Sequence, residues 1–78
     1  MQNRAIYDYS KLLGRIKEKG FTQVTLARVI GVSETTLNFS LNNKRPFKQD
    51  EIVKLCTALD ITLEDVEVYF FYHKTLEI

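Results

Sequence analysis

The sequence of 78 residues has one cysteine, one histidine, one proline, no tryptophan and no long apolar run. Because the single cysteine, Cys56, cannot form an internal disulfide, we expect a reducing compartment, the cytoplasm of a bacterial or phage-infected host cell. One cysteine and one histidine do not suffice for a dedicated zinc site, so neither a metal nor a cofactor is expected. The absence of about 18 consecutive apolar residues argues against a membrane partner, and the first ten residues lack the apolar core of a signal peptide.

The patterns of a catalytic site are also missing. The sequence has no paired acids beside a histidine, no nucleophile motif and no phosphate-binding glycine loop. We therefore expect no catalytic residues and no enzymatic activity. The length allows a single domain over residues 1–78, and a hydrophobic content of 45% favours a packed core over disorder.

Charge is divided unevenly along the chain, although the net charge is only +1. Residues 1–48 contain nine Lys and Arg against three Asp and Glu, a net charge of +6. Residues 49–78 contain two against seven, a net charge of −5. Such polarity fits a domain that turns one part toward an anionic partner, and it also fits two ordinary solvated surfaces.

Apolar residues at helical spacing predict an all-α fold of five helices. The first covers about 8–19, the second and third begin at the caps Thr22 and Ser33, and the fourth covers about 48–59. A short fifth helix opens at Thr62, where Asp65 completes a variant of the capping box. The aromatic segment from residue 68 onward is compatible with helix, strand or irregular structure, and the pattern leaves that choice open.

The segment of about residues 22–42 has the pattern of a helix-turn-helix. Ala27 is small enough for two helices to approach closely, and Gly31, four residues later, permits the positive backbone angle that ends the first helix. Val32 and Leu37 would anchor the second helix to the core, while Ser33 would cap it. The combination predicts a sharp corner between two helices.

These residues resemble the phage repressor and Cro-type helix-turn-helix family, whose fold is the five-helix lambda repressor-like domain. The resemblance covers about residues 8–71 and rests on three motifs: Gln23-Val-Thr-Leu-Ala27, Gly31-Val-Ser33 and Asn42-Asn43-Lys44-Arg45-Pro46. The chain departs from that family in two places. Asn43 replaces the usual glycine after the recognition helix, and Phe39 occupies a position that is often polar.

The resemblance implies DNA-binding roles for the following residues: Gln23, Ser33, Glu34, Thr35, Asn38, Phe39, Asn43, Lys44, Arg45 and Lys48. On the outer face of the third helix, Asn38 would pair with adenine and Glu34 would accept a bond from cytosine. Gln23 would bind a phosphate or brace a reading side chain, and the polar residues of 43–48 would hold backbone phosphates.

Simpler interpretations stand beside these roles. Phe39 could be buried or contact another protein, and Glu34 could merely favour the positive end of its helix. The aromatic run 69–72 is too large to be buried completely in so small a domain. Part of it is therefore expected in the core and the rest at a homodimer surface.

Two hypotheses for function follow. In the first, the chain is a dimeric, sequence-specific transcriptional regulator, a Cro-like phage or prophage repressor that reads double-stranded operator DNA in the major groove. In the alternative, the same fold serves as an antitoxin-like or adaptor module that binds another protein. The exposed aromatic residues and the acidic second half of the chain motivate this alternative.

Overall fold

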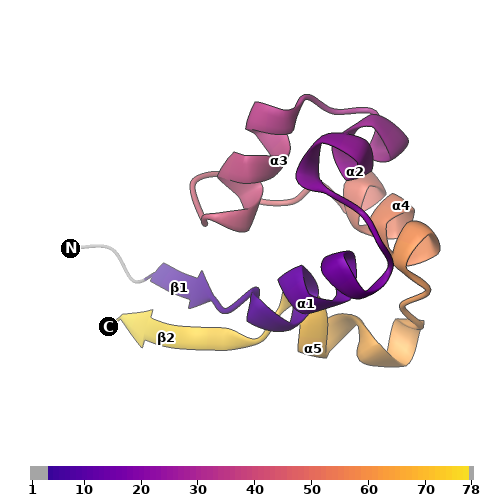
Figure 1. The fold of residues 1–78 in the computed structure, drawn as a ribbon. Helices are drawn as coiled ribbons and strands as arrows, with labels where there is room; N and C mark the ends of the chain where they lie inside the picture. Colours follow the sequence, from indigo (N-terminus) through magenta and orange to yellow (C-terminus); the bar gives the residue numbers. More distant parts are fainter. Residues whose placement is uncertain (1–3, 78) are drawn as a thin grey trace.

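Five α-helices and a two-stranded sheet make up the chain in the computed structural model, which describes the backbone of residues 4–77 and the side chains of residues 6–72 (Figure 1). The elements, in chain order, are β1 (Arg4–Tyr7), α1 (Ser10–Glu18), α2 (Gln23–Ile30), α3 (Glu34–Leu41), α4 (Gln49–Leu59), the 3₁₀ turn η1 (Leu63–Asp65), α5 (Val66–Phe70) and β2 (His73–Glu77). The predicted all-α class with five helices is confirmed. Within the described residues, no helix has the length and apolar character needed to cross a membrane.

Local side-chain chemistry sets the boundaries of α2 and α3 where the sequence predicts them. The Thr22 hydroxyl accepts a hydrogen bond from the backbone N–H of Thr25 at 3.1 Å, and the Ser33 hydroxyl accepts one from the N–H of Thr36 at 3.0 Å. Gly31 ends α2 with φ 78° and ψ 30°, a conformation in which a β-carbon is unfavourable. The two caps and the glycine together produce the sharp corner between the helices.

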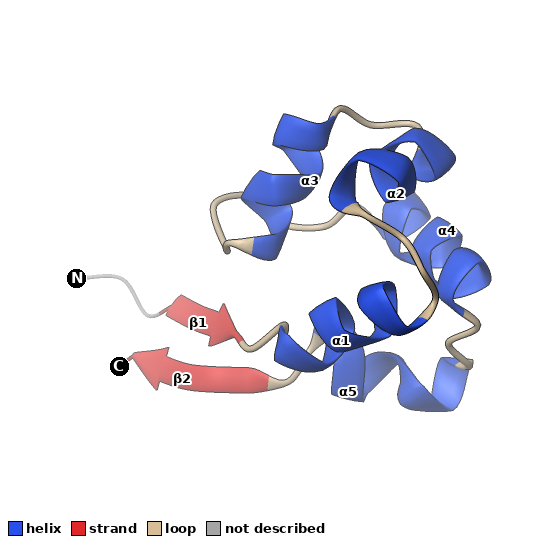
Figure 2. Cartoon of the chain, in the orientation of Figure 1, coloured by secondary structure: helices blue, strands red, loops and turns tan. Residues whose placement is uncertain are grey.

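A single apolar core fixes the helices against one another. α2 packs against both α3 and α4, and α1 packs against α5, as the ribbon also indicates (Figure 2). The buried apolar side chains come from all five helices and their flanks: Tyr9, Leu12, Ile16, Leu26, Ala27, Ile30, Leu37, Leu41, Leu55, Leu59, Ile61 and Phe70. Because α3 contributes Leu37 and Leu41 to this core, its opposite face is held in a fixed orientation.

Two cations, Arg15 of α1 and Lys19 directly after it, interact with the C-terminal end of α4. The Arg15 guanidinium donates to the carbonyl of Leu59 at 2.8 Å and to that of Asp60 at 3.1 Å. The Lys19 ammonium lies 2.7 Å from the Asp60 carboxylate, and this pairing lowers the pKa of Asp60. Positive charge at the negative end of a helix is stabilising, so both cations connect α1 to α4.

The two ends of the described chain form the antiparallel pair β1–β2, which projects from the helices (Figure 1). Arg4 pairs with Glu77 and Tyr7 with His73, with an irregularity between Ile6 and Tyr7. This pairing settles the choice that the sequence left open after residue 68: the chain is helical to Phe70 and extended from residue 73. Each strand has its hydrogen-bonding partner about 70 residues away, where no local pattern can reveal it.

The capping box predicted at Thr62 does not form. The Thr62 side chain makes no capping hydrogen bond. Instead, the N–H of Asp65 donates to the Thr62 carbonyl at 3.0 Å and closes a 3₁₀ turn before α5 begins. The tighter turn satisfies the Asp65 N–H with backbone, so the hydroxyl is not needed.

Candidate interaction surface

The outer face of α3 is exposed. Glu34, Thr35, Asn38 and Phe39 all lie on the surface, whereas the opposite side of the helix is buried. Glu34 stands in the first turn of α3, where a carboxylate is favourable whether or not it meets a base. The strip predicted from the sequence therefore exists as a surface, and its contact with base edges stays a prediction.

Gln23 and Asn38 connect the two helices of the corner on this surface. The side-chain N–H of Asn38 donates to the Gln23 side-chain oxygen at 3.2 Å, although the residues lie 15 positions apart. The bond places the first residue of α2 against the middle of α3. Gln23 thus has the bracing geometry that was one of its two predicted roles.

An aromatic ring and an ammonium group form the end of the α3 surface. Phe39 is 43% exposed, so it is not a core residue. The Lys44 ammonium lies 5.7 Å from the centre of its ring, within the range of a cation–π contact. This end of α3 therefore presents an apolar ring with a positive charge above it.

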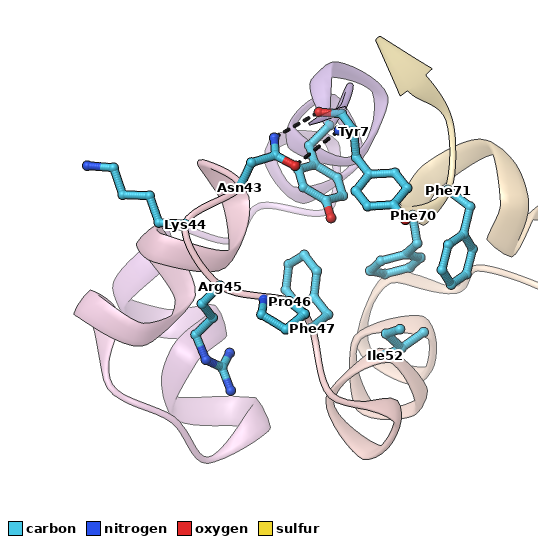
Figure 3. A pocket seen from close by; sticks show the side chains of 10 residues that line it. Tyr7, Asn43, Lys44, Arg45, Pro46, Phe47, Ile52, Phe70 and Phe71 are labelled. Atoms are coloured by element: carbon cyan, nitrogen blue, oxygen red, sulfur yellow. Dashed lines mark hydrogen bonds between the residues drawn. The ribbon is translucent and has the colours of Figure 1, made fainter. Parts of the chain in front are cut away.

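Asn43 holds the N-terminal strand. Its φ of 61° is the left-handed conformation predicted for this glycine-like position. Its amide also pairs with the backbone of Tyr7, accepting from the N–H at 3.0 Å and donating to the carbonyl at 2.9 Å (Figure 3). The side chain acts as a short strand partner for β1, a role that the sequence pattern did not indicate.

We expect Asn43→Gly to lower the free energy of unfolding by about 1–2 kcal/mol, because it keeps the favoured backbone angle but removes both bonds to Tyr7. Asn43→Ala should lower it by about one further kcal/mol, since alanine is also strained at positive φ. Urea denaturation of both variants measures the difference. Thr35→Ala, a change at an exposed residue of α3, is the control and should stay within about 0.5 kcal/mol of wild type. An Asn43→Gly variant as stable as wild type would show that the Tyr7 bonds contribute nothing.

Arg45 is engaged inside the fold. Its two terminal nitrogens meet the two carboxylate oxygens of Glu51 at 3.1 and 3.0 Å, and one of them also donates to the Ser40 hydroxyl at 2.7 Å. Glu51 is only 6% exposed, and the bonds from Arg45 hold the pKa of its carboxyl below its usual value. A phosphate contact by Arg45, as predicted from the sequence, has to compete with this two-pronged ion pair.

The other two predicted residues stand at helix starts. The Ser33 hydroxyl accepts a hydrogen bond from the backbone N–H of Thr36 and donates one to the Thr36 hydroxyl at 2.8 Å. Both bonds of this hydroxyl therefore cap the start of α3. The N–H of Lys48 donates to Glu51 at 3.0 Å at the start of α4, while its side chain is exposed. Lys44 and Lys48 are thus the exposed cations of the segment that was predicted to hold phosphates.

A cavity of about 280 Å³ lies beside the loop that joins α3 to α4 (Figure 3). Its walls include three aromatic rings in edge-to-face contact. The centre of the Phe47 ring lies 5.5 Å from that of Tyr9 and 5.6 Å from that of Phe70. Burial, with a smaller contribution from Tyr7, raises the pKa of Tyr9 to about 12, so its hydroxyl stays protonated. The cavity could accept an apolar side chain. It was not predicted, because its walls come from three segments far apart in the sequence.

The charged side chains of residues 1–48 and those of residues 49–78 differ in how many are bonded within the fold. In the basic half, Arg15, Lys19 and Arg45 bond acids or carbonyls of the fold itself. In the acidic half, Glu64 and Glu67 form no ion pair with another side chain of residues 6–72. Each ion pair uses one cation and one carboxylate, so pairing leaves the balance of charge unchanged but makes three cations of the basic half less available to an anionic partner.

Fold and surface together define a small five-helix domain that contains a helix-turn-helix and displays mixed polar and apolar side chains on its second helix. Among known families, residues 5–73 match the one described as "Protein of unknown function (DUF739)". The chain belongs to this family.

A solved structure extends the comparison. The chain is similar to the modulator of repression (MOR) of the temperate bacteriophage TP901-1 from Lactococcus lactis, whose solution structure superimposes with a TM-score of 0.72 at 46% sequence identity. The match covers 83% of this chain and 88% of that chain. The curated proteins offer no match. The chain is thus a relative of a phage regulatory protein.

The predicted membership in the phage repressor and Cro-type family is wrong. The matching family and the similarity to a modulator of repression place the chain elsewhere. The misleading signals were Ala27, Gly31 and Ser33, which do fold as predicted. They report how two helices meet at a tight corner, and such a corner does not specify what its outer face binds.

Proposed function

We propose that this chain is a phage regulatory protein that modulates repression by binding a repressor protein. The observation that carries the proposal is the similarity to a modulator of repression at 46% identity over 83% of the chain, with a shared fold. The adaptor hypothesis drawn from the sequence is the one that this similarity favours.

The surface composition supports a protein partner. Phe39 on α3 and Val24 and Val29 on α2 are each more than 40% exposed, and exposed apolar side chains among polar ones are typical of protein interfaces. DNA affinity, in contrast, depends mainly on cations that neutralise phosphates. Arg45, one of the cations predicted for that purpose, is held by Glu51.

Titration with the purified repressor encoded in the same genome tests the proposal. We expect a one-to-one complex with a Kd of about 1 μM or tighter by calorimetry, the range of specific regulatory complexes. Addition of the chain should also change the affinity of that repressor for its operator by about tenfold or more, because binding to one partner is linked to binding to the other. Absence of a complex at 100-fold the expected Kd, roughly 100 μM, would refute the proposal.

Direct operator reading by α3 is a second candidate, favoured by the bond between Gln23 and Asn38, which braces an exposed amide on the outer face. The same experiment separates the two candidates. An operator duplex that the chain alone binds at least about tenfold more tightly than a scrambled duplex would support direct reading. The homodimer predicted through the aromatic C-terminal region also stays a proposal, and Phe71 and Tyr72 are about half exposed there.

A further inference from the structure

An open apolar groove runs between α4, η1 and α5, away from the helix-turn-helix. It has a volume of about 470 Å³ and shares no lining residue with α2 or α3. Its walls are mostly apolar: Ile52, Val53, Cys56, Ile61, Leu63, Val66 and Phe71, with Gln49 and Thr57 at its edge. The residues come from both sides of the turn that follows Leu59 and are brought together by the fold.

Three apolar side chains of this groove are unusually exposed for their type. Leu63 is 91% exposed, Val53 is 60% exposed and Phe71 is 46% exposed. A leucine that stands almost wholly in solvent cannot enclose a small molecule, but it can insert into the surface of a protein partner. A contiguous apolar area of this kind is a feature of interaction sites.

Acidic residues outnumber basic ones among the chain neighbours of the residues that line the groove. Asp50 follows Gln49 at the start of α4, Glu64 follows Leu63, and Glu67 follows Val66. All three are exposed, and none forms an ion pair with another side chain in residues 6–72. Two cations, Lys48 and Lys54, stand among the immediate chain neighbours of the lining residues in α4 and α5. The unpaired charge beside the groove is therefore negative on balance.

We propose that this groove binds an apolar segment of the partner repressor that is flanked by Lys or Arg side chains. The inference rests on the proposed function, since it names the site on this chain where the repressor docks and the kind of repressor side chains that are bound there. A repressor needs a cationic surface to hold operator phosphates. Such a surface complements the acidic residues beside the groove, while its apolar residues fill the groove between Val53 and Leu63.

The groove also contains the only cysteine of the chain, Cys56, which serves as a built-in probe. Its side chain is half-buried and burial raises the pKa of its thiol, so it reacts slowly but measurably with 5,5′-dithiobis(2-nitrobenzoic acid). A saturating amount of the repressor should slow this reaction by about tenfold or more, because a docked segment covers the thiol.

Matched substitutions test the groove independently of the thiol. Val53→Asp and Leu63→Asp should each weaken repressor binding by about 30-fold or more, the size of an interface hot spot. Leu13→Asp is the control: Leu13 is 43% exposed on α1, outside the groove, and should change the Kd less than about twofold. Glu64→Lys should reduce the association rate more than it raises the dissociation rate. Because all these positions are exposed, circular dichroism should show folded variants.

The outcomes separate the inference from the function on which it rests. Wild-type protein that binds no repressor refutes the proposed function. Wild-type protein that binds the repressor, while Val53→Asp and Leu63→Asp bind equally well and Cys56 reacts at its free rate, refutes the groove alone. Sedimentation of the chain without repressor completes the test: a dimer in which Cys56 is protected would assign the groove to a second copy and overturn the inference.

Discussion

Phe70→Ala is expected to lower the free energy of unfolding by about 3–5 kcal/mol, the range for removing a large aromatic side chain from a core. Phe70 is 2% exposed and is the largest of the fully buried side chains. Its ring meets Phe47 edge to face at 5.6 Å, and such a contact adds to the effect of burial. Because Phe70 is the last residue of α5, its loss should also loosen the attachment of β2.

The neighbouring ring provides the control. Phe71 is 46% exposed, so Phe71→Ala should lower the free energy of unfolding by only about 1 kcal/mol. Urea denaturation followed by circular dichroism measures both variants, and amide hydrogen exchange of residues 73–77 reports on the strand. Equal effects at positions 70 and 71 would contradict the assignment of Phe70 as the core anchor.

Phe70 and Phe71 show how much of the core could be predicted from the sequence. The pattern indicated that part of the aromatic run 69–72 is buried, and this is confirmed, but it could not say which ring. That choice depends on Phe47 and Tyr9, which approach from distant parts of the chain. Helix boundaries were more accessible, because Thr22, Gly31 and Ser33 act through bonds and backbone angles within a few residues.

The candidate surface shows the same division. The family resemblance implied an outer-face position for Asn38 and Phe39, and both are exposed, although the sequence left open that Phe39 is buried. The ion pair between Arg45 and Glu51 could not be predicted. The sequence around a cation that follows a helix is the same whether its side chain faces solvent or a carboxylate. The α4–α5 groove was missed for another reason: helical spacing shows that a segment forms a helix but not whether another element covers it, and only the fold shows that Val53 and Leu63 remain uncovered.

Arg45→Ala is expected to lower the free energy of unfolding by about 2–3 kcal/mol, because it leaves a nearly buried Glu51 carboxylate without its partner. The value lies below that of a fully enclosed pair because the Arg45 side chain is 24% exposed and water can partly replace it. Arg45→Met combined with Glu51→Leu should recover only part of the loss, since the two apolar groups need no partner but the buried Ser40 hydroxyl and the Lys48 N–H lose theirs. Lys44→Ala is the control and should change stability by less than about 0.5 kcal/mol.

The pH dependence of stability gives the second, independent measurement of this ion pair. The pKa of Glu51 lies below its ordinary value of 4.5 in the folded chain, mainly because Arg45 bonds its carboxylate. The pair therefore contributes fully above about pH 4.5, and its contribution is lost as the pH falls through the lowered pKa. Glu51→Gln should flatten this part of the profile, while Arg45→Ala should move the loss to higher pH, since burial alone raises the pKa of a carboxyl. If Arg45 served a phosphate and not Glu51, both variants would follow the wild-type profile.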